Sequence, residues 1–73
     1  MNVLRPGSKV LIHGEIPARI LAVLFRELGG EVVVQYQLVW WKEGSRNSEY
    51  LDSFEFEAVE GAERVEVGFE RSA

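Results

Sequence analysis

The stretch from Val32 to Trp41, VVVQYQLVWW, constrains the fold of this chain more than any other. Neighbouring side chains on a strand point to opposite faces, so Trp40 and Trp41 must separate. One face carries only apolar side chains, namely Val32, Val34, Tyr36, Leu38 and Trp40. The other face contains two glutamines, Gln35 and Gln37, and is the wetter one. We therefore predict a strand with Trp40 in the core and Trp41 on the surface.

The apolar segment Ala18–Leu28 precedes this strand and has two interpretations. As a helix it would have one apolar face, with Pro17 at its first position and Gly29 after its end. As a strand it would be apolar on both faces, which suits a bent strand shared by two sheets or covered by a partner. Because the residues before it are poor helix caps, we favour the strand. The pair Gly29-Gly30 then predicts a two-residue hairpin turn.

Shorter elements are expected on both sides of this hairpin. Lys9–His13 is predicted to be a first strand, followed by a loop over residues 14–17. After Trp41, a polar loop is expected over residues 42–47, followed by a short strand at Ser48–Leu51.

The C-terminal part begins with a predicted tight turn at Asp52-Ser53. The next strand is expected at Phe54–Glu57, with both phenylalanines, Phe54 and Phe56, pointing inward. A last alternating piece places Val65, Val67 and Phe69 on one face. This piece is predicted to be an extra edge strand or a tail that docks on a neighbouring molecule.

Length and composition predict one small domain. The chain has 73 residues, 47% of them hydrophobic, and no cysteine, so its stability must come from an apolar core. No signal peptide is evident, and the longest apolar run, Ile20–Phe25, is too short to span a bilayer. We expect a cytoplasmic protein that does not associate with membranes. About five short antiparallel strands in so small a chain predict an all-β fold, a small closed or nearly closed barrel.

The order of these motifs resembles a known architecture. The segments PGSKVLIHG, PARILAV, VQYQLVWW and YLDSFEFE together are similar to small SH3-like barrels of the Tudor type, and to short bacterial and phage-associated proteins with a Y-x-V-x-W-W strand. The residues that match are Ala18, Ile20, Tyr36, Leu38, Trp40, Trp41, Glu55 and Glu57, with Leu38 in place of the pattern's valine. The resemblance implies an SH3-like core over about residues 6–57, a C-terminal extension over 58–73, and an origin in phage or other mobile DNA. It implies no particular function, because such barrels have many unrelated roles.

Aromatic residues on the wetter face are the best candidates for a contact surface. Trp41 and Val39 lie on that face, and Tyr50 lies on the strand expected to pair with it. Aromatic side chains bury a large area at low entropic cost, which suits recognition. A cage for a methylated cation is a weaker interpretation, because it would have only Trp41 and Tyr50 as aromatic walls, with a carboxylate from Glu43, Glu49 or Asp52.

Charge gives an alternative site. The net charge is −4, which disfavours generic binding of nucleic acid. The acidic residues gather in the C-terminal half, where they are expected to form a solvated face. Basic residues of the N-terminal half supply an alternative nucleic-acid face, made of Lys9, Arg19, Arg26 and Lys42.

Catalytic chemistry finds little support in the sequence. His13 is the only histidine and is expected to be a surface residue at a strand end, with no nucleophile or metal-ligand spacing around it. We therefore expect no catalytic residues, no cofactor and no metal. The interpretation that results is a non-catalytic interaction module that binds a protein partner, or itself as a homo-oligomer, with a nucleic-acid-associated barrel as the alternative.

Overall fold

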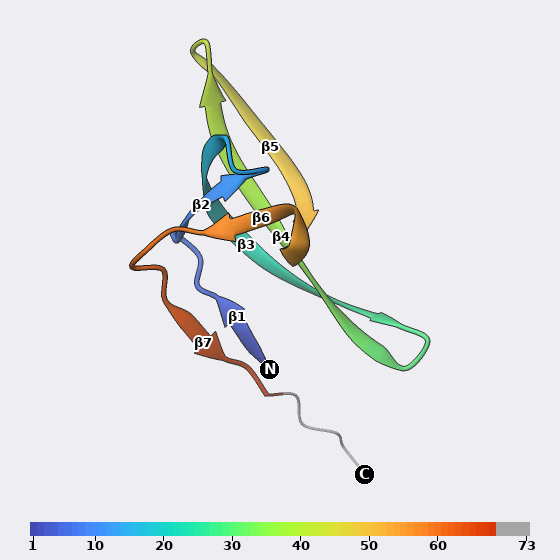
Figure 1. Ribbon diagram of the computed structural model, residues 1–73. Coiled ribbons are helices and arrows are strands. Elements are labelled where there is room, and N and C mark those ends of the chain that lie inside the picture. The colour runs from blue at the N-terminus through green and yellow to red at the C-terminus, as the bar shows by residue number, and fades with distance from the viewer. Residues whose placement is uncertain (69–73) are drawn as a thin grey trace.

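Two long antiparallel strands, β3 (Ile16–Leu28) and β4 (Glu31–Lys42), are the framework of the computed structural model, which describes residues 1–68 (Figure 1). The ambiguous segment Ala18–Leu28 is therefore a strand, as favoured, and not a helix. Leu28 pairs with Glu31 across Gly29 and Gly30, whose φ angles of 57° and 82° are easily adopted only by glycine. The predicted two-residue turn is confirmed.

A bulge in β3 explains why this strand is apolar on both sides. Ile20 pairs with Leu38, but Ala22 already pairs with Gln37, so Leu21 is an extra residue in β3. The bulge reverses the alternation of side chains. Before it the buried positions are even-numbered (Ala18, Ile20), and after it the residues packed on the core are odd-numbered (Val23, Phe25).

Three shorter strands complete the larger sheet. They are β2 (Lys9–Ile12), β5 (Ser45–Asp52) and β6 (Phe56–Ala58), and the antiparallel strand order is β5-β4-β3-β2-β6. The fold is thus all-β, as predicted. Within residues 1–68 no strand pairing joins β6 to β5, so hydrogen bonding does not close the sheet into a barrel.

Two predicted loops are shorter than expected, because residues with positive φ reverse the chain within two or three positions. His13 and Gly14 have φ angles of 51° and 71°, so β3 begins at Ile16 and includes Pro17, which had been assigned to the loop. Proline is tolerated there because pairing with β4 begins only at Arg19. Glu43 and Gly44, with φ angles of 52° and 78°, form the second turn, so β5 begins at Ser45 and not at Ser48.

A 3-10 helix replaces the start of the predicted strand at Phe54–Glu57. This helix, η1 (Ser53–Glu55), also takes the place of the predicted tight turn, and a Glu55 carboxylate oxygen accepts a hydrogen bond of 2.8 Å from the backbone N–H of Asp52. Phe54 is 84% exposed, so the prediction that it points inward was wrong. Phe56 is buried, as predicted, and packs edge-on against Tyr36 with ring centroids 5.2 Å apart.

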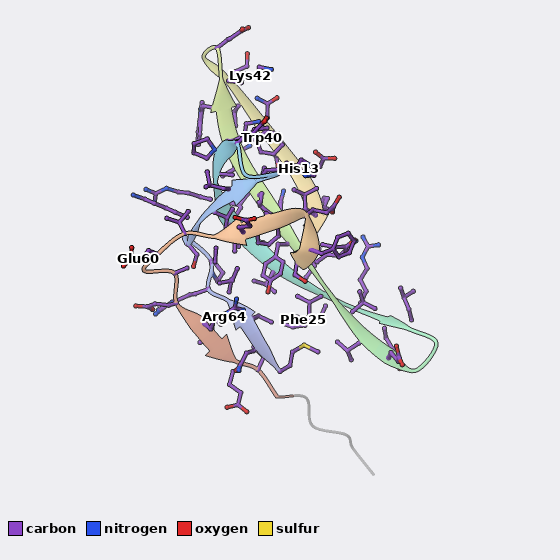
Figure 2. The ribbon with its side chains drawn as sticks, viewed as in Figure 1. His13, Phe25, Trp40, Lys42, Glu60 and Arg64 are labelled. Carbon is purple, nitrogen blue, oxygen red and sulfur yellow. The ribbon has the colours of Figure 1, made fainter. Side chains whose placement is uncertain are left out.

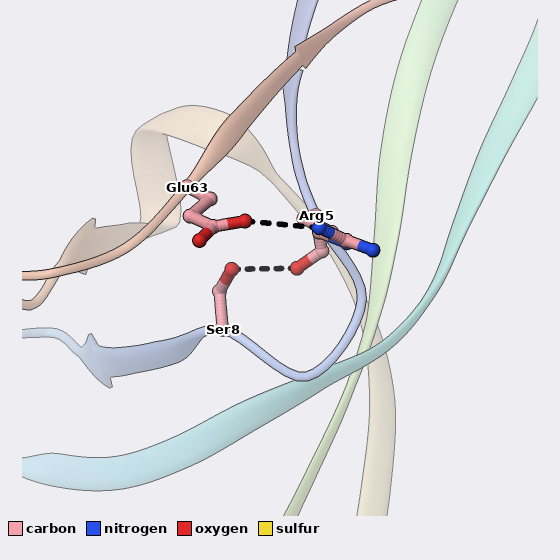
Figure 3. Close-up of polar contacts among 3 residues, drawn as sticks. All are labelled: Arg5, Ser8 and Glu63. Carbon is pink, nitrogen blue, oxygen red and sulfur yellow. Dashed lines mark hydrogen bonds and ion pairs between the residues drawn. The ribbon is translucent and has the colours of Figure 1, made fainter.

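A second, two-stranded sheet covers one side of the core. It pairs β1 (Asn2–Leu4), which the sequence analysis did not anticipate, with β7 (Arg64–Glu66), the extra C-terminal strand. Next to this sheet, Arg5 Nη1 and Glu63 Oε2 form an exposed ion pair of 3.0 Å, and the Ser8 hydroxyl donates to the Arg5 carbonyl oxygen (Figure 3). Val67 packs on the core, whereas Phe69 lies outside the described residues.

The core lies between the two sheets and confirms the face predicted for β4 from Val34 onward, whereas Val32 is 39% exposed. Tyr36 and Leu38 are buried, and Val34 and Trp40 pack against the same cluster. The Tyr36 hydroxyl accepts a buried hydrogen bond of 3.2 Å from the Leu4 backbone N–H, which ties β4 to β1. The other members of the buried cluster are Val3, Val10, Ile12, Ala18, Ile20, Leu51 and Phe56. Residues 1–68 contain no helix with the length and apolar character needed to cross a membrane.

Candidate binding pocket

The face of β2, β3 and β4 that points away from the core carries a concave, mainly apolar surface. Alternation along each strand sets its members, because Val10, Ala18 and Leu38 point inward and their neighbours therefore point outward. Leu11 pairs with Pro17, and Arg19 pairs with both Lys9 and Val39, so these side chains share the outer face.

The resulting pocket, here called the Trp41 pocket, has a volume of about 390 Å³. Its lining residues are Lys9, Val10, Leu11, Pro17, Ala18, Arg19, Val39, Trp40, Trp41 and Val59. Pockets of this size that combine apolar walls with a few polar groups are typical of binding sites. Leu11, Pro17 and Val59 are lining residues that the sequence analysis did not identify.

One of these missed residues, Leu11, had a signal in the sequence. Leu11 lies between the core residues Val10 and Ile12, so its side chain has to reach the opposite face. Pro17 was missed because it was assigned to a loop. Val59 lies beyond the end of β6, and only the folded chain brings it to the pocket.

The two residues predicted to form the contact surface differ sharply in exposure. Trp41 is 63% exposed and lies at the pocket wall, in the position expected for a contact residue. Val39 is only 6% exposed, so the expectation of an exposed valine on a wet face needs correction. Its strand is not at the edge of the sheet, and Val39 is paired with Arg19 on one side and Ser48 on the other.

Tyr50, the third predicted contact residue, is 51% exposed and pairs with Gln37 on β5. It shares the outer face with Trp41, but it does not line the Trp41 pocket. The carboxylates considered for a cation cage, those of Glu43, Glu49 and Asp52, do not line the pocket either.

The structure divides the four basic residues of the alternative site. Lys9 and Arg19 are direct cross-strand neighbours at the pocket. Lys42 is at the β4–β5 turn, toward the opposite end of the molecule from Phe25, the neighbour of Arg26 (Figure 2). Arg26 pairs with Val33, about 20 Å along β4 from Val39 at the usual strand rise. Lys9 and Arg19 are therefore paired directly, whereas Lys42 lies about 10 Å along β4 from Val39, the partner of Arg19.

A second hollow, of about 300 Å³, contains the Arg5–Glu63 ion pair and is lined by Arg5, Pro6, Gly7, Ser8, Gly61 and Glu63. His13 is exposed at the β2–β3 turn and lines a hollow of about 130 Å³ with Phe54 and Glu57. Across residues 1–68, no cluster of three or more histidine, cysteine or acidic side chains is placed to hold a metal ion.

No family model, curated protein or solved structure matches this chain. The site is therefore interpreted from its geometry alone.

Proposed function

We propose that this protein is a non-catalytic interaction module that binds a short segment of a protein partner in the Trp41 pocket. The observation that carries the proposal is a tryptophan that is 63% exposed beside a mainly apolar concavity of about 390 Å³. A side chain of this kind gains most when a partner covers it, because aromatic residues dominate the energetics of protein interfaces. The surrounding Leu11, Pro17 and Val59 supply apolar contact for a partner side chain.

We further propose that the fold is an SH3-like, partly closed barrel. In support, β2 to β5 follow one another as neighbours in the sheet, and the chain then returns through η1 so that β6 pairs with β2. Such a return brings the two ends of the meander toward each other, as a small barrel requires.

The proposed function can be tested by selecting binders from a displayed library of random linear peptides. The wild-type protein is the target, and peptides that also bind the Trp41→Ala variant are removed. We expect peptides that bind the wild-type protein and lose at least about tenfold in affinity for Trp41→Ala, as is typical of a central aromatic contact. Tyr50→Ala is the matched control, since it removes an exposed aromatic of the same face outside the pocket. Peptides that bind both variants as well as the wild-type protein would contradict the proposal.

The alternative function, association with nucleic acid, has one favourable observation. Lys9 and Arg19 lie together beside Trp41, and single strands bind to cations combined with stacking aromatics. The net charge of −4 and the distance of Arg26 from this pair weigh against it. We therefore rank the protein partner first.

A further inference from the structure

Two like charges face each other directly at the edge of the Trp41 pocket. Lys9 on β2 and Arg19 on β3 are cross-strand partners, both exposed, and both line the pocket. Like charges in directly opposite positions of an antiparallel pair destabilise it, whereas opposite charges stabilise it. The arrangement therefore opposes folding and calls for another explanation.

No carboxylate in the described part of the chain neutralises these two residues. Over residues 1–68 the ion pair that forms is Arg5–Glu63, and neither Lys9 nor Arg19 has an acidic side chain within 4.0 Å. Glu57, which pairs with Leu11, is an acidic residue on the same face, yet it forms no ion pair with either cation. The chain has 12 acidic residues, so acidic groups are abundant but are placed elsewhere.

We infer that Lys9 and Arg19 form a clamp for carboxylates, and that the pocket binds a peptide segment in which acidic side chains flank an apolar one. This inference rests on the proposed function and names the chemistry of its ligand. The apolar side chain lies against Trp41, and the carboxylates accept hydrogen bonds from the Lys9 ammonium and the Arg19 guanidinium. The planar guanidinium offers two parallel N–H donors to one carboxylate, which adds geometric selectivity.

The charge distribution favours an acidic peptide over a nucleic acid strand. A nucleic-acid strand carries a negative charge at every nucleotide, so a protein that binds it needs a continuous row of cations. Here the cations near the pocket are Lys9, Arg19 and Arg46, the partner of Trp41, while Glu57 lies on the same face and Arg26 is about 20 Å away along β4. A peptide with one or two carboxylates can bind these cations without placing further negative charges against the acidic rest of the surface.

The first test needs no ligand. Arg19→Glu places an acidic side chain directly opposite Lys9 and turns a repulsive pair into an attractive one. Arg26→Glu is the matched control, because it gives the same net charge on the same face of the same strand but faces Val33. We expect the thermal midpoint of Arg19→Glu to exceed that of Arg26→Glu by about 2–6 °C. A midpoint equal to or below that of the control would overturn the inference that the cation pair is kept at the expense of stability.

The second test determines the amino-acid composition of the Trp41-dependent peptides, which are those that bind the wild-type protein and lose affinity for Trp41→Ala. We expect enrichment of aspartate and glutamate next to an apolar residue in peptides selected by the wild-type protein, and loss of this enrichment for Arg19→Glu and for Lys9→Gln. A selected acidic peptide should bind Arg19→Glu about fivefold or more weakly than wild type and should bind Arg26→Glu nearly as wild type does. Raising the salt concentration should reduce this difference.

Several outcomes separate the inference from the proposed function. Trp41-dependent peptides without acidic residues would overturn the carboxylate clamp and leave the pocket as a peptide site. An absence of Trp41-dependent peptides would overturn both. Tighter binding of an oligothymidine strand than of any acidic peptide, weakened by Arg19→Glu, would overturn the choice of a peptide as the ligand.

Discussion

Adjacent tryptophans on β4 differ in burial because strand alternation turns Trp40 toward the core and Trp41 away from it, although both line the Trp41 pocket. Trp40 packs against the buried cluster, whereas Trp41 is 63% exposed. The prediction from strand alternation is confirmed for this pair, and it carries an energetic consequence.

Replacing each tryptophan by alanine should separate folding from binding. We expect Trp40→Ala to lower the free energy of unfolding by about 2 kcal/mol or more, since it leaves a void beside packed side chains. Trp41→Ala should lower it by less than about 1 kcal/mol, because little of the ring is buried by the chain itself. Urea unfolding followed by circular dichroism measures both. Equal losses for the two variants would contradict the assignment of faces.

The long hairpin is the element that extends beyond the rest of the sheet. β2 accompanies β3 only as far as Arg19, and β5 accompanies β4 only as far as Gln35, so the remainder of the hairpin is a two-stranded ribbon (Figure 1). Side chains near its turn are exposed, with Leu28 at 61% and Val32 at 39%. Two-stranded ribbons have little stability of their own, so the tip depends on the sheet for its order.

Shortening this ribbon should leave the body of the protein folded. Deletion of Glu27, Leu28, Glu31 and Val32 retains the Gly29-Gly30 turn and closes it on the existing Arg26–Val33 pair. Because the deleted side chains are exposed, we expect the free energy of unfolding to change by less than about 1 kcal/mol. Deletion of Phe25 and Val34 as well, which pack on the core, is the contrasting variant and should destabilise the protein strongly.

Light scattering on the same samples tests whether the protein self-associates through the ribbon. If it does, the molar mass should fall when the ribbon is shortened.

At the scale of the whole molecule, stability depends on the contact between the two ends of the described chain. The sheet of β1 and β7 covers the core, and Val3 and Leu4 of β1 are 2% and 4% exposed. Residues far apart in sequence must meet before this sheet forms, which makes it a late and entropically costly part of the fold.

Ending the chain at Glu60 should therefore destabilise the entire protein. The truncation removes β7 and its pairing with β1, and we expect a loss of about 2 kcal/mol or more in the free energy of unfolding. Arg5→Ala is the control, since it removes only the exposed Arg5–Glu63 ion pair and should cost less than about 1 kcal/mol. If the two variants were equally stable, the second sheet would not contribute to the core.

Local patterns were sufficient to predict much of this architecture. The face of β4 with Tyr36, Leu38 and Trp40, the Gly29-Gly30 turn and the strand at Ala18–Leu28 all follow from alternation and turn chemistry, which act between near neighbours. Exposure of Trp41 follows from the same alternation. Phe54 was misplaced because the turn after β5 became the 3-10 helix η1, which interrupts the alternation at that position.

The sequence by itself determined the all-β character, the central hairpin and the separate environments of Trp40 and Trp41, because alternation and glycine turns depend on residues that are close along the chain. Only the tertiary structure decided the bulge at Leu21, the pairing of β1 with β7, and the placement of Lys9 directly opposite Arg19 beside Trp41. These features depend on strand register and on contacts between distant segments, which cooperative packing of the whole core selects.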